Sequence, residues 1–169
     1  MPLRRPDIGF LPTPWPVVEV VFELAALRPQ DVFYDLGSGD GRLLVLAAQR
    51  FGTRGVGIDI DPDRIQVAAQ NAIAAQVSQL VSFRQQDLFT SDFQEATVLF
   101  LYLLPHLNLR LRPRLFQQLR PGTRLISLDF DMGDWLPACS RSVPLEIADE
   151  TATLYYWEIP THLPPNFIP

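Results

Sequence analysis

Apolar residues recur along this chain in two spacings, as short continuous runs and as stretches with an apolar residue at every third or fourth position. A short run bounded by turn residues is typical of a strand buried on both faces, and the wider spacing is typical of a helix with one buried side. Strands are expected at residues 32–36, 55–60, 80–84, 96–102 and 123–130, and helices at residues 17–27, 42–51, 64–76 and 107–119. The alternation predicts an α/β fold in which helices cover both faces of a parallel sheet.

The pattern changes in the last part of the chain. Residues 143–147 and 151–159 flank a polar turn at residues 148–150, which predicts a C-terminal β-hairpin. Added to the five expected parallel strands, this hairpin gives the sheet an antiparallel edge. Ligands of such sheets lie beyond the carboxyl ends of the central strands, so functional residues are expected in the loops that follow those strands.

The prolines mark the limits of the domain. Five of the sixteen lie within residues 2–16, and four lie within residues 160–169. Proline disfavours regular structure, and the chain length of 169 residues suits one domain. We therefore expect a proline-rich arm over residues 1–16, a single domain over residues 17–160 and a tail over residues 161–169.

Composition excludes several classes of function. The net charge of −5 and the pI of about 4.9 disfavour a nucleic-acid partner, whose binding surface is usually basic. One cysteine and two histidines cannot form an internal disulfide or a zinc cluster, so no metal is expected. Glu19 and Glu23 interrupt the apolar stretch at residues 17–27, which argues against a signal peptide or a membrane span. These features predict a cytoplasmic protein and leave its oligomeric state open.

The strongest chemical signal is D-L-G-S-G-D-G-R at residues 35–42, between an expected strand and an expected helix. A dinucleotide-binding turn has the spacing G-x-G-x-x-G, and here the third glycine comes one position early. Asp35 and Asp40 flank the loop; they disfavour a pyrophosphate and suit a ligand with cationic ammonium and sulfonium groups. A purely structural turn rarely has this many glycines, so Asp35, Gly37, Gly39 and Gly41 are candidate cofactor-binding residues.

Two more acids lie at or just past the ends of expected strands. Asp59 comes 24 residues after Asp35, near the spacing of about 20 residues expected for an acid that binds ribose hydroxyls. Asp61, before Pro62, is the better candidate for the cap of the next helix. Asp87 follows the third strand, where its carboxylate can accept a hydrogen bond from an adenine amino group. Ile60 and Leu88 are candidates to hold the two faces of the adenine ring.

The glycine motif and three further segments resemble small bacterial class I S-adenosylmethionine-dependent methyltransferases. The segments are L-P-T-P at residues 11–14, L-Y-L-L-P at residues 101–105 and D-F-D-M-G-D-W at residues 129–135. The chain is similar to the protein-lysine methyltransferases of the mitochondrial adenine nucleotide translocase and ATP synthase c-subunit. The resemblance implies a Rossmann-like class I sheet, S-adenosylmethionine as cofactor, S-adenosylhomocysteine as product and a protein substrate. If the arm folds over the cofactor, Thr13 is a candidate contact for the methionine carboxylate.

Candidates for the acceptor side follow the fourth and fifth strands. Asp129 and Asp131, with Asp134 and Trp135, form an acidic and aromatic cluster that suits a cationic side chain. A solvated loop with one tryptophan packed on the core explains the same residues equally well. Tyr102 is a further catalytic candidate, although a buried strand residue is an equal alternative.

Two classes of function remain open. The first is methyl transfer to nitrogen, with a protein lysine as the expected acceptor and Asp129, Asp131 and Tyr102 as catalytic candidates. The second is a non-catalytic module that binds S-adenosylmethionine or a nucleoside. A methyltransferase for a small molecule is a further alternative, because the sequence does not name the acceptor.

Overall fold

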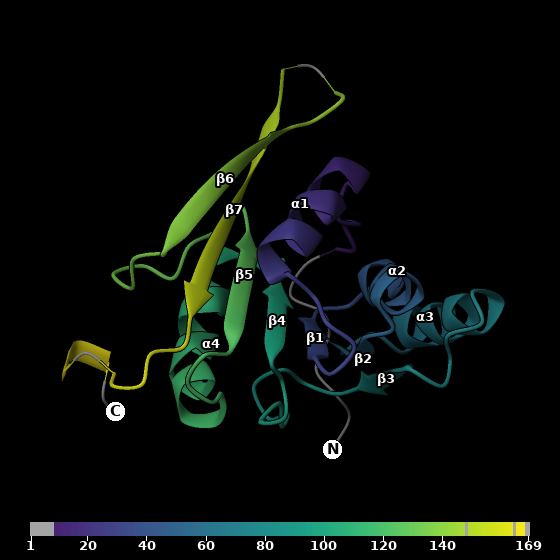
Figure 1. Ribbon diagram of the computed structural model, residues 1–169, viewed down its shortest axis with the longest axis horizontal. Coiled ribbons are helices and arrows are strands. Elements are labelled where there is room, and N and C mark those ends of the chain that lie inside the picture. Colours follow the sequence, from purple (N-terminus) through teal and green to yellow (C-terminus); the bar gives the residue numbers. More distant parts are fainter. Residues whose placement is uncertain (1–8, 148, 164, 168–169) are drawn as a thin grey trace.

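Seven strands form one mixed sheet in the computed structural model, which describes residues 9–147, 149–163 and 165–167. Their order across the sheet is β3-β2-β1-β4-β5-β7-β6 (Figure 1). The parallel strands are β1 (Val32–Leu36), β2 (Arg54–Asp59), β3 (Val81–Gln85), β4 (Val98–Leu101) and β5 (Arg124–Leu128); the antiparallel pair is β6 (Cys139–Pro144) and β7 (Thr151–Glu158). The helices are α1 (Trp15–Ala25), α2 (Arg42–Phe51), α3 (Pro62–Ala74), α4 (Pro105–Gln118) and the 3-10 turn η1 (Pro165–Phe167). The expected class I methyltransferase sheet, five parallel strands with an antiparallel edge, is confirmed.

Two apolar clusters lie on opposite faces of this sheet. On one face α1 and α2 pack against strand residues that include Phe33 and Phe100. On the other face α4 packs against residues that include Tyr34 and Leu99. Side chains that are adjacent in a strand point to opposite faces, so both must be apolar where helices cover both faces. This explains the continuous apolar runs of the sequence.

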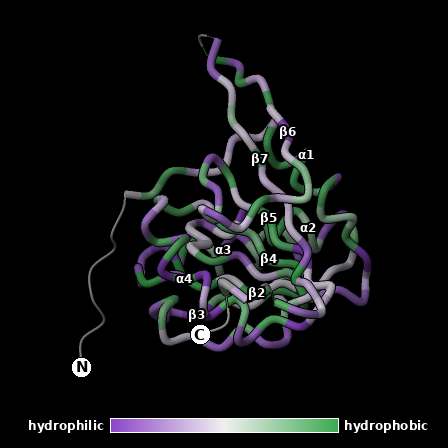
Figure 2. Tube along the Cα trace, turned by 90° about the vertical axis from the view of Figure 1, so that its left-hand side faces the viewer, coloured by the Kyte–Doolittle hydropathy of each residue, from purple (hydrophilic) through white to green (hydrophobic). Residues whose placement is uncertain are grey.

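The β6–β7 hairpin extends past the carboxyl end of the parallel strands. Leu128, the last residue of β5, pairs with Leu154 of β7, so residues 145–147 and 149–153 of the hairpin lie beyond the end of β5. Figures 1 and 2 show this hairpin rising from the body of the molecule, on the side where the parallel strands end. The hairpin therefore stands beside the loops that carry the candidate site residues.

Several boundaries differ from the sequence-based expectation. β6 begins at Cys139 rather than at residue 143, because its first four residues are exposed and give no apolar signal, whereas their ladder with β7 defines them. β5 ends at Leu128 because Asp129 has a left-handed backbone, with a φ of 64°. Residues 15 and 16 of the expected arm belong to α1, and residues 1–8 lie outside the described part of the chain. Within the expected tail, the Phe167 ring packs on Phe116 at a centroid distance of 5.5 Å.

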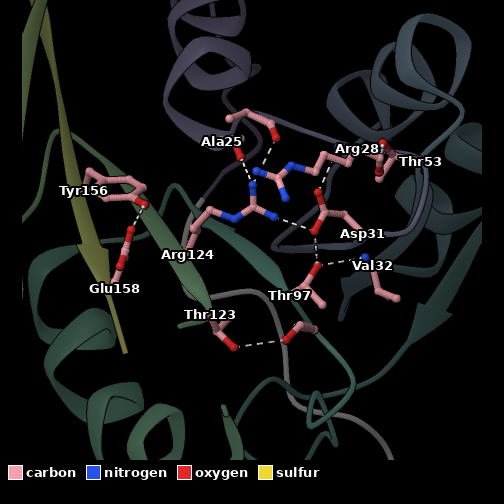
Figure 3. Close-up of polar contacts among 12 residues, drawn as sticks. Ala25, Arg28, Asp31, Val32, Thr53, Thr97, Thr123, Arg124, Tyr156 and Glu158 are labelled. Carbon is pink, nitrogen blue, oxygen red and sulfur yellow. Dashed lines mark hydrogen bonds and ion pairs between the residues drawn. The ribbon is translucent and has the colours of Figure 1, made fainter. Parts of the chain in front are cut away.

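A buried ion pair joins the end of α1 to the amino-terminal edge of the sheet (Figure 3). Arg124 at the start of β5 donates to the Asp31 carboxylate and to the carbonyl of Ala25, the last residue of α1. The Thr97 hydroxyl also donates to Asp31, at 2.8 Å. Burial by itself raises the pKa of Asp31, but the hydrogen bonds from Arg124 and Thr97 outweigh it and hold the pKa below its ordinary value. The network fixes the carboxyl-terminal end of α1 on the sheet.

We expect Arg124→Met to lower the free energy of unfolding by ~3–5 kcal/mol at neutral pH, because it leaves the Asp31 carboxylate buried without its cation. The lowered pKa means that the Asp31 contribution is complete above its unfolded pKa of about 3.9 and is lost as pH falls through the folded value. The deficit of the variant should therefore shrink in acid. Urea unfolding at several pH values measures it, with Arg124→Met/Asp31→Asn as the control that removes the unpaired charge. A deficit below ~1 kcal/mol at pH 7 would mean that the pair adds no more than a surface ion pair does.

Candidate active site

A cavity of about 320 Å³ opens at the carboxyl ends of the parallel strands. It collects seven of the nine cofactor-binding candidates: Thr13, Asp35, Gly37, Asp59, Ile60, Asp87 and Leu88. Two of the three catalytic candidates, Tyr102 and Asp129, also line it. Gly39, Gly41 and Asp131 are the candidates that are not among its lining residues. Most of the candidate residues, drawn from the arm and from the carboxyl ends of all five parallel strands, therefore share one cavity.

The glycine loop packs closely against β2 and against two aromatic rings, besides lining the cavity. The backbone N–H groups of Gly37 and Ser38 donate to the Ile58 carbonyl, which draws the loop after β1 against β2. A side-chain carbon at Gly39 would lie 2.3 Å from the Phe10 ring, and one at Gly41 would lie 2.5 Å from the Phe83 ring. Both glycines also have a positive φ, which side chains disfavour. Gly39 and Gly41 thus make room for protein rings, whereas Gly37 faces the cavity.

Asp35 is the most strongly perturbed acid of the cavity. Its side chain, at the end of β1, is only 6% exposed. Burial raises the pKa of Asp35 to about 8, and the negative charges of Asp59 and Asp40 add to the effect. In the free protein Asp35 therefore holds a proton at neutral pH. A cation in the cavity would favour its ionised form.

Asp59 and Asp61 have separate structural roles. The Asp59 carboxylate accepts hydrogen bonds from the backbone N–H of Gly39 at 2.9 Å and from that of Asp61 at 3.0 Å. It thereby joins the glycine loop to the loop after β2. Asp61 accepts from the Asp63 N–H at 2.9 Å and is the N-cap of α3, as the sequence indicated. The capping role leaves Asp59 as the acid of the pair that is expected to bind a ribose.

The loop after β3 forms another wall of the cavity. Asp87 accepts from the Phe89 N–H at 2.9 Å, and its carbonyl accepts from the Ser91 hydroxyl at 2.7 Å. Phe89 also lines the cavity, and the Arg110 guanidinium lies 3.8 Å from the centroid of its ring. Phe89 was not a candidate from the sequence, because a single aromatic residue after a strand can equally line a cavity or pack in the core.

The last residues of the arm form the wall opposite the strand ends. Residues 9–13 all line the cavity, and Thr13 is 8% exposed. Phe10 lies against Gly39, and the Arg64 guanidinium of α3 is 4.1 Å from the centroid of the Phe10 ring. Neither Phe10 nor Arg64 was a candidate from the sequence. An aromatic residue within a proline-rich arm was the available signal for Phe10.

Tyr102 and Asp129 stand where β4 and β5 end. Burial raises the pKa of Tyr102, and the charge of Asp129 adds to that rise. Asp129 is held in its left-handed conformation by two bonds to β7: its N–H donates to the Thr153 carbonyl at 2.7 Å, and its carboxylate accepts from the Thr153 N–H at 3.0 Å. The next residue, Phe130, is fixed through its carbonyl, which accepts from Ser127 and from the buried Asn108 at 2.6 and 3.2 Å. This wall of the cavity is rigidly supported.

The other members of the acidic and aromatic cluster lie elsewhere. Asp131 is exposed and accepts from the Gly133 N–H, and Asp134 pairs with Arg112 of α4. Trp135 is 8% exposed and packs on Phe116 and Trp157, at centroid distances of 4.6 and 5.5 Å. Of this cluster, the structure brings Asp129 to the cavity and places the tryptophan in the core.

The chain is similar to known methyltransferases over the region that forms the cavity. The family model described as the ANTKMT methyltransferase domain matches residues 35–139, from the glycine motif to the start of β6. The chain belongs to this family. It is 35% identical over 158 residues to a protein-lysine N-methyltransferase of Saccharolobus islandicus, an alignment that covers 93% of this chain and 97% of the relative.

Two further relatives differ in what their names say of the acceptor. The adenine nucleotide translocase lysine N-methyltransferase of Mus musculus is 33% identical over 121 residues, and the alignment covers 71% of this chain and 52% of the relative. The chain therefore spans about half the length of that relative. A crystal structure described as an RNA methyltransferase from Salinibacter ruber, in complex with S-adenosyl-L-homocysteine, is 53% identical, with a TM-score of 0.85. It covers 94% of this chain and 100% of that chain.

The cofactor of these methyltransferases is S-adenosylmethionine, and the cavity fits it. Six lining residues are aspartates and two are arginines, of which Arg42 is paired with Asp40. An excess of carboxylates suits a ligand that carries a sulfonium and an ammonium group. Within the described ranges no group of three or more His, Cys, Asp or Glu residues is arranged to hold a metal, and no helix is long and apolar enough to cross a membrane.

We expect Asp59→Ala to weaken S-adenosylhomocysteine binding by ~1–3 kcal/mol, because it strands the N–H groups of Gly39 and Asp61 as well as any ligand hydroxyls. Asp61→Ala should instead lower the free energy of unfolding by ~1 kcal/mol through loss of the α3 cap. Calorimetric binding and urea unfolding of both variants separate the two effects. The assignment fails if Asp61→Ala is the variant with the larger loss of affinity.

The raised pKa of Asp35 predicts that cofactor binding releases a proton. Below pH 8 the carboxyl is largely protonated, and a bound ammonium favours the carboxylate, so affinity for S-adenosylhomocysteine should rise between pH 6 and pH 8. Full coupling gives about tenfold per pH unit. Calorimetry in buffers of different ionisation enthalpy counts the released protons, and Asp35→Asn should abolish the release. An affinity of the unmodified protein that does not change with pH would contradict the prediction.

Proposed function

We propose that this methyltransferase transfers a methyl group from S-adenosylmethionine to the ε-amine of a lysine in a protein substrate. The observation that carries the proposal is the charge of the cavity, where aspartates outnumber arginines six to two, and five to two while Asp35 is protonated. This charge attracts a cationic side chain and repels the phosphates of a nucleic acid. The protein-lysine N-methyltransferase of Saccharolobus islandicus, which aligns along nearly its whole length, supports the same acceptor.

In this proposal the residues near β1, β2 and β3 hold the cofactor. Asp35 and Thr13 contact its methionine part, Asp59 binds the ribose hydroxyls, and Asp87 accepts from the adenine amino group. Ile60 and Leu88 lie on the two faces of the adenine ring. The bound cofactor supplies an activated methyl group on its sulfonium, so the protein's main contribution is to align the acceptor, and alignment accounts for ~7–11 kcal/mol of barrier lowering in favourable cases.

The acceptor is assigned to the wall formed by Tyr102 and Asp129. A lysine amine must be unprotonated when it attacks, and a carboxylate beside it can accept an N–H hydrogen bond and orient the nitrogen lone pair. The raised pKa of Tyr102 keeps its hydroxyl protonated at neutral pH, so that it is available as a hydrogen-bond partner. The left-handed backbone of Asp129, fixed by Thr153, sets the direction of that carboxylate.

The proposal also includes a cytoplasmic location. The cysteine, Cys139, is exposed and free, which suits a reducing compartment.

RNA is the competing acceptor, because the Salinibacter ruber structure at 53% identity is described as an RNA methyltransferase. The net charge of −5 opposes RNA, since phosphate contacts require basic side chains.

A methyl-transfer assay distinguishes the acceptors. The chain contains no lysine, so label that appears on lysine after incubation with tritiated S-adenosylmethionine must reside on substrate and not on the enzyme. Cell lysate treated with nuclease, lysate treated with protease, and purified total RNA are incubated separately with the enzyme. Methyl-lysine in hydrolysates of the nuclease-treated sample supports the proposal. Label confined to RNA would overturn it.

We expect Asp129→Asn to lower kcat by about 10²-fold while the affinity for S-adenosylhomocysteine stays nearly unchanged, because the carboxylate faces the acceptor. Asparagine tolerates the left-handed backbone and keeps an oxygen for the Thr153 bond, so the fold should be retained. Asp131→Asn makes the same chemical change two residues away, outside the cavity lining, and is the matched comparison. Equal losses in both variants would assign the effect to the charge of the loop rather than to Asp129.

A further inference from the structure

The Phe10 ring packs between two segments of the cofactor cavity, the glycine loop at Gly39 and helix α3 at Arg64. One side of its ring meets the glycine loop so closely that a side-chain carbon on Gly39 would lie 2.3 Å from Cε2 and 2.8 Å from Cδ2. The Arg64 guanidinium of α3 also stacks on the ring, 4.1 Å from its centroid. The ring is 38% exposed, so it is held by these contacts and not by the core.

We propose that Phe10 and Arg64 form a clasp that holds residues 9–13 across the cofactor cavity. Phe10 is then a cofactor-positioning residue, and the clasp must open for the cofactor to enter or leave. The inference rests on S-adenosylmethionine as the cofactor and is independent of which acceptor the enzyme methylates.

The position of the segment supports this role. Residues 9–13 all line the cavity, so they form one of its walls and not a distant surface. Within the described part of the chain, no backbone-to-backbone hydrogen bond joins these residues to the sheet or to the helices. Packing of side chains therefore holds the wall in place, and the stacked Phe10 ring is at the centre of that packing. A wall held in this way can separate from the domain without breaking the sheet.

The clasp is also joined to the ribose acid. The Gly39 N–H donates to the Asp59 carboxylate at 2.9 Å, and Phe10 packs on Gly39. Arg64 lies in the first turns of α3, the helix that Asp61 caps, and both residues line the cavity. The ring thus packs on the glycine loop and on Arg64 of α3, next to the hydrogen bonds that the Asp59 carboxylate accepts from the backbone N–H groups of Gly39 and Asp61. Loss of the ring should loosen the ribose end of the cavity.

Trp15 provides a direct reporter of the clasp. It begins α1, two residues after Thr13, and is 57% exposed, with the Arg42 guanidinium 5.3 Å from the centroid of its ring. Trp135 and Trp157 are buried in the cluster on the α4 side of the sheet, whereas α1, which begins with Trp15, packs on the opposite face. A fluorescence change on cofactor binding therefore reports mainly on Trp15 and the segment before it.

The test is the rate and affinity of S-adenosylhomocysteine binding to Phe10→Ala, followed by stopped-flow Trp fluorescence and by calorimetry. Loss of one cation–π contact and its packing should raise the dissociation constant about 3- to 30-fold, mainly through faster dissociation. Phe167→Ala is the matched control, since its ring is also stacked by an arginine, Arg112, at 4.8 Å, but on the α4 side of the domain. Affinity and dissociation rate of Phe10→Ala within twofold of the unmodified protein would overturn the proposal.

Two further variants keep the result specific to the clasp. Arg64→Met retains an apolar stem but removes the cation, so it should weaken binding in the same direction as Phe10→Ala. Gly39→Ala should weaken binding both by displacing the ring and by straining a residue whose φ is positive, and in Phe10→Ala/Gly39→Ala only the second effect remains, so the combined loss should be smaller than the sum of the single losses. Additive losses would show that Gly39 acts without Phe10 and would contradict the clasp. Melting temperatures of all variants confirm that each is folded.

Discussion

The Asp59 carboxylate is the point on which the cavity depends. It accepts backbone hydrogen bonds from Gly39 in the loop after β1 and from Asp61 in the loop after β2. Neither loop has regular structure of its own, so this shared acceptor fixes their separation, and with it the width of the cavity between them. The Gly37 and Ser38 bonds to the Ile58 carbonyl reinforce the same junction. A ligand that binds to Asp59 therefore meets a site whose shape is set before it arrives.

The second constraint is the clustering of aspartate side chains in the cavity. The parallel strands end at one edge of the sheet, where the strand ends and the loops after them bring Asp35, Asp59, Asp87 and Asp129 to one cavity. Such a cluster costs free energy in the absence of a cation, and the rise in the pKa of Asp35 to about 8 is the visible sign of that cost. The protein carries this electrostatic cost because its ligand is cationic. The same charge supports the proposal that the acceptor is a lysine amine and not a phosphate-bearing nucleic acid.

Two supports outside the glycine motif complete the site. Bonds to Thr153 of β7 hold Asp129, so the hairpin at the sheet edge also sets the cavity wall that Tyr102 and Asp129 form. The Arg124–Asp31 pair anchors the end of α1, and the arm before α1 reaches the opposite wall through Phe10. Contacts outside the glycine motif thus position two walls of the cavity, the one formed by Tyr102 and Asp129 and the one formed by residues 9–13.

The sequence by itself determined the sheet, the glycine loop, the α3 cap at Asp61 and the set of acids at the strand ends. Local signals suffice for these features, because strand periodicity, turn glycines and caps depend on residues within a few positions of one another. Tertiary structure decided which residues share the cavity. It separated Asp129 from Asp131 and Trp135, because a left-handed residue and a bond to β7 turn the chain between them. It also brought Phe10 onto Gly39 and under Arg64, a contact between segments some thirty to fifty positions apart in the sequence, and no local pattern encodes such a contact.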